Sequence, residues 1–338
     1  MSYLFLIAGL SMLILGGDAL VRGAVSLAVR LNIPHLIIGL TIVAFGTSAP
    51  ELLISIRSAL EGAPGLAVGN VVGSNIANIW LVLGIPALIA AINCHQKYIT
   101  HNLVFMLLIS VTLIVLCLWQ PLTLWHGAIM VGLLLAFLLD CAYRAQAHKN
   151  AAEVIDDDVE ELIEQAEGNP ASSSWKMIGL LLIGLIGLAV GAELTVQGAI
   201  EVARTFGVSE ATIGLTVVAI GTSLPELAAT VMAAFRSQPG LALGNAIGSN
   251  IYNIGAVLGI TALIAPIEVE PTFLDFDLWV MLAAALSIVP FILLKGHITK
   301  LMGLLFLMAY GAYIYKVVDL GRLPSPEQTQ ITKQAVQT

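Results

Sequence analysis

The stretch that decides the fold is HLIIGLTIVAFGTSAPELLISI, residues 35–56, which returns in similar form as ATIGLTVVAIGTSLPELAATVM at residues 211–232. Each run is apolar except at one point, where GTSAPE (46–51) or GTSLPE (221–226) brings together hydroxyls, a proline and a carboxylate. A charged side chain in so apolar a segment is costly, and by default it marks function. The two motifs are therefore the first candidates for a functional site.

The composition around these motifs is that of a membrane protein. The chain is 58% hydrophobic and 11% charged, with a mean hydropathy of +0.95, whereas soluble domains carry about 25% charged residues. Its apolar runs are continuous and long enough to cross a hydrocarbon core of about 30 Å, which predicts helices rather than a barrel. We predict ten spans, at about residues 3–29, 35–60, 66–92, 98–118, 122–143, 175–204, 210–236, 241–266, 273–294 and 298–317.

The chain is an internal duplication. With a shift of 175 residues, segment 37–92 overlies segment 212–267 without a gap, and 34 of the 56 aligned positions are identical. Each half contains five predicted spans. Because five is odd, the second half has to cross the membrane in the opposite sense, giving an inverted-topology repeat typical of secondary transporters. The predicted units are a first repeat (1–144, motif region 38–92), an acidic linker (145–174), a second repeat (175–317, motif region 213–267) and a polar tail (318–338).

The distribution of basic residues predicts the orientation. Most of them lie in or near loops that follow odd-numbered spans, namely Arg30, Lys97, Arg144, Lys149, Lys176, Arg236, Lys295 and Lys300. Cytoplasmic loops carry the excess of Lys and Arg. We therefore expect the acidic linker in the cytoplasm and both termini outside it, in the plasma membrane (the inner membrane of a bacterium). The sequence has no basic patch of the kind that would suggest a nucleic acid partner.

The two prolines predict a broken helix in each half. Pro50 and Pro225 lack an N–H group and clash with the preceding turn, so neither fits within a continuous helix. The hydroxyls before them can cap the half-helix that starts at the proline; these belong to Thr47, Ser48, Thr222 and Ser223. The first segment then ends in unpaired carbonyls around Ala44 and Ala219. Such backbone is tolerated at membrane depth only in a buried or cavity-lining place, where carbonyls bind cations well.

Glu51 and Glu226 lie in the first turn after each break, and a second motif adds neutral oxygens. In GNVVGSNIANI and GNAIGSNIYNI, a serine and an asparagine four residues apart share a helix face; these pairs are Ser74 with Asn78 and Ser249 with Asn253. An all-oxygen set with two carboxylates suits hard cations, and its charge matches one Ca²⁺. The sequence thus predicts a cation site at the interface of the repeats.

These paired motifs resemble the two α-repeats of the calcium/cation antiporter superfamily, most closely its bacterial inner-membrane sodium/calcium exchanger branch. The resemblance covers nearly the whole chain and implies exchange of Na⁺ for Ca²⁺ by alternating access. It implies as ligands Glu51, Glu226, Thr47, Ser48, Thr222, Ser223, Ser74, Ser249, Asn78 and the carbonyls of Ala44 and Ala219. One position departs from the pattern that the resemblance implies: well-studied exchangers of the family carry an aspartate where this chain has Asn253. The site therefore has two titratable groups, which leaves the stoichiometry and any use of H⁺ or K⁺ open.

Several alternatives remain at this point. A Ca²⁺/H⁺ or K⁺-linked antiporter of the same fold is the nearest; an intramembrane enzyme that uses the two glutamates as acid and base, or a passive channel, is more remote. We expect a monomer with no cofactor besides the transported ions. Asp18 and Glu193 correspond across the repeats and interrupt apolar helices, so they serve either as structural anchors, with Arg22 one turn from Asp18, or in gating.

Overall fold

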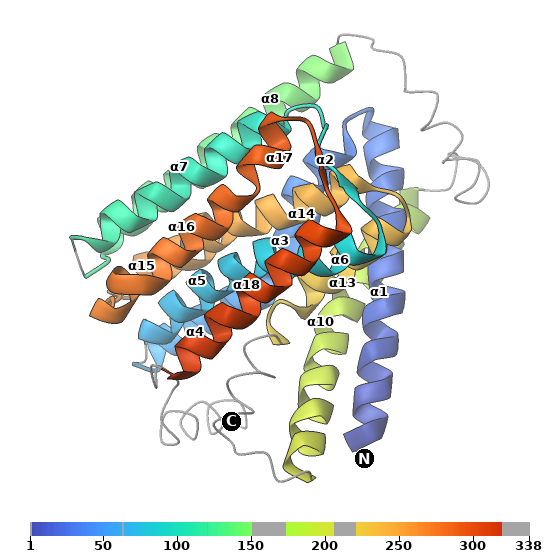
Figure 1. Ribbon diagram of the computed structural model, residues 1–338. Coiled ribbons are helices and arrows are strands. Elements are labelled where there is room, and N and C mark those ends of the chain that lie inside the picture. The colour runs from blue at the N-terminus through green and yellow to red at the C-terminus, as the bar shows by residue number, and fades with distance from the viewer. Residues whose placement is uncertain (1, 63, 120, 151–173, 206–220, 320–338) are drawn as a thin grey trace.

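The computed structural model describes residues 2–62, 64–119, 121–150, 174–205 and 221–319, and these residues are almost entirely helical (Figure 1). Eight helices in this part of the chain are long and apolar enough to cross a membrane, or nine if one bent pair counts as a single span. The predicted span 210–236 is described only from residue 221 onward. The predicted linker 145–174 and tail 318–338 lie mostly outside the described residues.

The longest helices, α1 (Ser2–Leu31) and α10 (Ser174–Thr205), lie side by side. Figure 1 shows this pair running apart from the slanting helices α7 (Ile99–Cys117), α8 (Leu124–Asn150) and α16 (Leu278–Ser287). Glycines let the two backbones approach, because a Cβ on Gly184 would lie 2.6 Å from the amide nitrogen of Leu20. The corresponding first helices of the two repeats thus form one unit.

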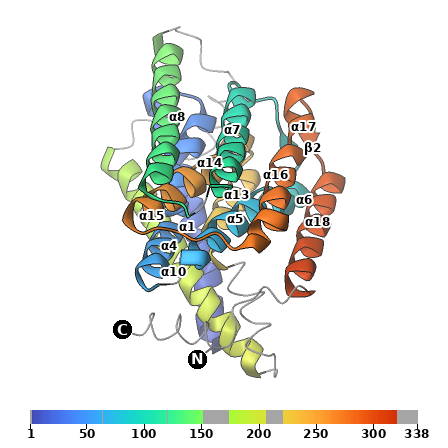
Figure 2. The ribbon, with the colours of Figure 1, turned by 90° about the vertical axis from the view of Figure 1, so that its left-hand side faces the viewer.

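The motif-bearing helices α5 (Pro64–Trp80) and α14 (Pro239–Tyr252) lie in the interior. In the apolar stretch that includes α14, 83% of residues are buried, against 17% in the outer helix α18 (Lys300–Asp319). α14 contacts elements from both halves of the chain: α5 and α7, and also α2 (His35–Ile38), η1 (Gly39–Val43), α3 (Ala44–Thr47) and α13 (Leu224–Phe235). Figure 2 shows α5 and α14 surrounded by the outer helices. The polar motifs are therefore held at the centre of the bundle.

The remaining elements connect this core. They are α2 (His35–Ile38), η1 (Gly39–Val43), α3 (Ala44–Thr47), α4 (Ala49–Leu60), α6 (Gly84–Ile89), α13 (Leu224–Phe235), η3 (Asn253–Leu258), α15 (Gly259–Ile264), η4 (Phe273–Asp277) and α17 (Val289–Leu293). The outer faces carry many exposed leucines, isoleucines and aromatics. Such an apolar exterior is what a bilayer requires of a multi-pass protein.

Three of the described segments are π-helical, which was not predicted from the sequence. η1 ends directly before Ala44, and η3 begins at Asn253. In the first repeat, the N–H of Val82 donates to the carbonyl of Ala77, five residues earlier, at 2.8 Å. This is the spacing of a π-helical turn, and it occurs just after Asn78. π-helical turns are frequent at functional sites, because the extra residue widens the helix and re-aims side chains. Here η1, η3 and the turn at Val82 each adjoin a predicted ligand.

Two details of the secondary structure go beyond what was predicted from the sequence. The chain is not purely helical: β1 (Ile92–Asn93) and β2 (His297–Ile298) pair antiparallel, because two loops at the same end of the bundle satisfy each other's backbone groups. Helix α8 also continues to Asn150, past the predicted start of the linker at residue 145. The run CAYRAQAHKN has good helix formers, so its polarity ends the span but not the helix.

Candidate cation-binding site

The first motif forms the predicted break. His35–Thr47 and Ala49–Leu60 meet at Ser48 with a bend of 42°, and Pro50 occupies the first turn of α4. Ser48 takes the N-cap position, yet its side chain makes no capping hydrogen bond. In the second motif Ser223 likewise precedes α13 without capping it. The predicted capping role is therefore wrong for both serines, which leaves their hydroxyls available for other contacts.

We predicted that the carbonyl of Ala44, at the end of the first segment, would be unpaired, but it accepts a hydrogen bond. The oxygen of Ala44 accepts the N–H of Ser48 at 3.0 Å, and the Thr47 hydroxyl lies 3.4 Å away. The tight turn at the break closes this hydrogen bond even though the helix axis bends. A carbonyl oxygen has a second lone pair, so Ala44 still offers an acceptor toward the break. Ala219, its counterpart, lies outside the described residues.

The two motifs meet across the repeats. The hydroxyl of Ser48 donates to Oε1 of Glu226 at 3.2 Å, and the hydroxyl of Thr47 lies 3.3 Å from Oδ1 of Asn245. Glu51 and Glu226 are each 1% exposed. Ser48 precedes Glu51 by three residues, so its hydrogen bond brings Glu226 to the break that carries Glu51. Sequence positions 175 residues apart thus supply one buried, doubly acidic centre, which a cation would stabilise.

Many buried polar atoms at this centre have no hydrogen-bond partner among the described residues. Six are oxygens of predicted ligands: Oε2 of Glu51, Oε2 of Glu226, Oγ of Ser223, Oγ of Ser249, Oδ1 of Asn78 and Oδ1 of Asn253. Buried polar groups are normally satisfied, so a concentration of orphaned oxygens indicates a place for a ligand. Within the same part of the chain no cluster of three or more His, Cys, Asp or Glu residues occurs. The donor set is two carboxylates with neutral oxygens, as hard cations require.

Other predicted ligands are buried or partly buried. Ser74, on α5, and Thr47 are buried, and Thr222 is partly buried in the turn before α13. Asn253 donates from Nδ2 to Oδ1 of Asn75 at 3.0 Å. The sequence analysis missed three asparagines that hydrogen-bond residues of the site: Asn70, Asn75 and Asn245. The signal was present in the sequence, since all three repeat in both copies of the GN…GSN motif.

The two repeats do not make the same contacts. Three hydrogen bonds between the repeats have no counterpart: Thr47 donates to Asn245, Ser48 to Glu226 and Asn253 to Asn75. With the shift of 175, their mirror contacts would be Thr222 to Asn70, Ser223 to Glu51 and Asn78 to Asn250. None of these three is present, although all six residues are described, and Ser223, Asn78 and Asn250 retain unpartnered atoms. The repeats are therefore similar in sequence but differ in these three contacts.

Asp18 joins α1 to the second repeat. Its carboxylate pairs with Arg22 at 2.9 Å, as predicted, and also accepts from Nε of Arg236 at 2.6 Å and from Nη2 of that residue. Arg236 follows the last residue of α13. Glu193, the counterpart of Asp18, is exposed and bonded to Gln197. The ion pair anchors α1 to the helix that carries Glu226.

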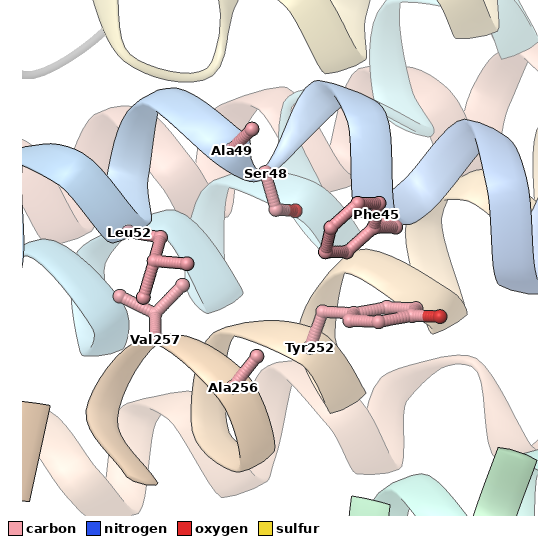
Figure 3. A pocket seen from close by; sticks show the side chains of 7 residues that line it. All are labelled: Phe45, Ser48, Ala49, Leu52, Tyr252, Ala256 and Val257. Carbon is pink, nitrogen blue, oxygen red and sulfur yellow. The ribbon is translucent and has the colours of Figure 1, made fainter. Parts of the chain in front are cut away.

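A small pocket opens beside the site (Figure 3). Ser48 is the polar group nearest to Glu226 in its lining, which otherwise consists of Phe45, Ala49, Leu52, Tyr252, Ala256 and Val257. The rings of Phe45 and Tyr252 lie 5.8 Å apart and face each other across it. The pocket is lined on one side by the first motif and on the other by α14 and η3.

Comparisons with known proteins agree with this architecture. The family model described as sodium/calcium exchanger protein matches residues 1–140 and 176–318. The putative antiporter CaxA of Alkalimonas amylolytica is 42% identical over 317 residues, covering 92% of this chain and 97% of CaxA. The inner membrane protein YrbG of Escherichia coli is 37% identical over 282 residues, covering 83% and 85%. The sodium-calcium exchanger NCX_Mj, soaked with 10 mM Na⁺ and 10 mM Sr²⁺, superposes with a TM-score of 0.78 at 34% identity, covering 93% of this chain and 97% of NCX_Mj. The chain therefore belongs to the sodium/calcium exchanger protein family.

Proposed function

We propose that this protein exchanges Na⁺ for Ca²⁺ across the membrane by alternating access, at a site between Glu51 and Glu226. The observation that carries the proposal is the set of six buried ligand oxygens, drawn from both motifs, that lack partners among the described residues. Ca²⁺ takes six to eight oxygen ligands, and Na⁺ accepts similar ones. The proposed ligands are those predicted from the sequence, with Asn253 among the neutral donors.

The charges at the site make exchange of the two ions reasonable. Two glutamates neutralise one Ca²⁺, whereas three Na⁺ would leave one positive charge in excess. A cycle of three Na⁺ for one Ca²⁺ would therefore move one net charge across the membrane. Either ion would also relieve the repulsion between the two carboxylates, so an empty site is the least stable state and the loaded states are favoured.

The proposed architecture is ten helices in two inverted repeats of five, spanning residues 1–144 and 175–317. Inverted repeats with broken helices at their interface allow a central site to open to one side and then the other. We place both termini outside the cytoplasm, in line with the basic residues in the odd-numbered loops. The name of YrbG as an inner membrane protein supports the same location here. We propose that a single chain is sufficient for transport.

A Ca²⁺/H⁺ antiporter is the second candidate. The observation that favours it is Asn253, which leaves Glu51 and Glu226 as the acidic groups of the site. In that cycle each glutamate would release a proton when Ca²⁺ binds and regain one when Ca²⁺ leaves.

Calcium uptake into reconstituted vesicles tests both candidates. Vesicles containing the protein are given an outward Na⁺, K⁺ or proton gradient in turn, with the other gradients collapsed. We expect uptake with the Na⁺ gradient at fixed pH. Glu51→Gln should abolish it, and Glu61→Gln, at an exposed residue paired with Arg57 at the end of α4, is the matched control. Uptake that ignores the Na⁺ gradient and follows the proton gradient would reject the first candidate in favour of the second.

A further inference from the structure

Two asparagines lie behind the proposed ligands, one in each repeat. Asn70 is on α5 and Asn245 is on α14, and Asn245 is 1% exposed. Neither belongs to the ligand set described above. Both direct their side chains at the helix that carries a glutamate, so each couples two elements of the site.

The hydrogen bonds of the two asparagines are equivalent. Nδ2 of Asn70 donates to the carbonyl of Glu51 at 3.3 Å and to the hydroxyl of Ser55 at 3.0 Å. Nδ2 of Asn245 donates to the carbonyl of Glu226 at 3.2 Å and to the hydroxyl of Thr230 at 2.9 Å. An amide has two N–H groups, so both bonds can be made at once. The same pattern formed by different hydroxyl residues shows that the bonds follow from the position rather than from identical side chains.

These bonds fix the register between the charged and the neutral ligands. The carbonyl and the hydroxyl are four residues apart, one helical turn, so each amide fixes the first turn of α4 or α13 to its neighbour. On α5 the same face continues from Asn70 to Ser74 and Asn78, and on α14 it continues to Ser249 and Asn253. One side chain per repeat therefore sets how far the carboxylate lies from the serine and asparagine oxygens.

Asn245 also joins the two repeats. Its Oδ1 lies 3.3 Å from the hydroxyl of Thr47, while its Nδ2 holds the second motif. Loss of this amide would release Thr47 and Glu226 together. Asn70 has no corresponding contact with Thr222, although both residues are described, so Asn245 contributes more contacts to the site than Asn70 does.

We propose that Asn70 and Asn245 are positioning residues for the cation site, acting through Glu51 and Glu226 without touching the ion. This inference rests on the proposed function. Partners that orient metal ligands from outside the ligand shell typically change affinity by about 10- to 100-fold when removed. The effect should appear in cation affinity rather than in the amount of folded protein, with Asn245→Ala more severe than Asn70→Ala.

The test is equilibrium binding of Ca²⁺ alone to the purified full chain in Na⁺-free buffer, followed by the dependence of vesicle uptake on Ca²⁺ concentration. We expect Asn245→Ala to raise the Kd and the KM by about 10- to 100-fold, while saturating Ca²⁺ restores much of the maximal rate. Asn102→Ala is the matched control, since Asn102 is an equally buried amide on α7 outside the motifs. Its Kd should equal that of the unaltered protein.

Two further variants keep the inference falsifiable if Asn245→Ala does not fold. Thr230→Val and Ser55→Ala remove only the hydroxyl partner of each amide, and we expect smaller increases in Kd. An unaltered Kd in folded Asn245→Ala, or in both of these variants, would overturn the positioning role. Failure of the proposed function looks different: the unaltered protein would bind no Ca²⁺, or Glu226→Gln would bind as tightly as the unaltered protein.

Discussion

Ser48 donates a hydrogen bond to the carboxylate of Glu226 at 3.2 Å, across 178 residues of sequence and across the boundary between the repeats. The corresponding hydroxyl, on Ser223, is buried and has no partner among the described residues. The same residue type at the same motif position thus has two different environments. This difference can be tested by removing each hydroxyl in turn.

We expect Ser48→Ala and Ser223→Ala to differ in the cation-free protein. A hydrogen bond to a charged group contributes about 1.5–3 kcal/mol, so Ser48→Ala should lower the free energy of unfolding by up to that amount. Ser223→Ala removes an unsatisfied hydroxyl and should leave stability unchanged or slightly higher. Thermal unfolding in detergent with a chelator present measures both. Equal losses in the two variants would contradict the asymmetric arrangement.

Replacement of either glutamate should separate stability from function. In Glu51→Gln and Glu226→Gln one of two neighbouring buried charges is removed, so we expect the cation-free protein to become more stable, by on the order of a few kcal/mol. The increase in Tm that Ca²⁺ causes in the unaltered protein should disappear, because binding stabilises only the state that binds. Thermal scans with and without Ca²⁺ make the comparison. A Ca²⁺-dependent Tm that survives in both variants would remove these residues from the site.

The contact between α1 and α10 gives a prediction about packing. Gly184→Ala would place a Cβ 2.6 Å from a backbone nitrogen of α1, and such overpacking costs about 1–3 kcal/mol. Gly179, on the same helix, has nothing within 4 Å of the equivalent position. Gly179→Ala should therefore be neutral or stabilising by up to about 1 kcal/mol, because alanine favours helix. Urea or thermal unfolding distinguishes them, and equal effects would mean that the helices do not approach as described.

Thiol reactivity tests the packing of the connection between α6 and α7. Cys94 lies directly after β1 and is buried, and burial raises the pKa of its thiol to about 11. Only about a thousandth of it is thiolate at pH 8, and the thiolate is the reactive form. Cys117 and Cys141 are also buried and free. We expect no rapid reaction of the folded protein with a maleimide, and three reacting thiols after denaturation. Fast labelling of folded Cys94 would show that the loop is open.

Much of the fold could be predicted from the sequence because its physical causes are local. Long apolar runs require helices in a membrane, and Pro50 requires a break, so the spans and the bend at Ser48 were predictable. The π-helical turns were not, since one extra residue per turn leaves no mark in an apolar pattern. The pairing of β1 with β2 was missed for a related reason: residues 92 and 298 meet only after the helices between them have packed.

The site was predictable in its chemistry and less so in its contacts. The duplicated Glu51 and Glu226 were identified because an acid in an apolar segment is costly, and its recurrence at the same place in both repeats points to a shared binding role. Asn70 and Asn245 were overlooked, although they repeat as faithfully, because an asparagine can act as ligand, helix contact or anchor, and only coordinates distinguish these roles. Because the two motifs are nearly identical, the sequence could not predict that Ser48, and not Ser223, bonds a glutamate.

The inequality of the repeats also has a spectroscopic consequence. If the two carboxylates had matching neighbours, their stretching vibrations would coincide in an infrared spectrum. With Oε1 of Glu226 bonded to the hydroxyl of Ser48, and the hydroxyl of Ser223 making no such bond to Glu51, the two groups should absorb at separate frequencies, and each band can be assigned by the variant that removes it. Because the segment is duplicated, the glutamate of one repeat serves as an internal reference for the equivalent glutamate of the other repeat.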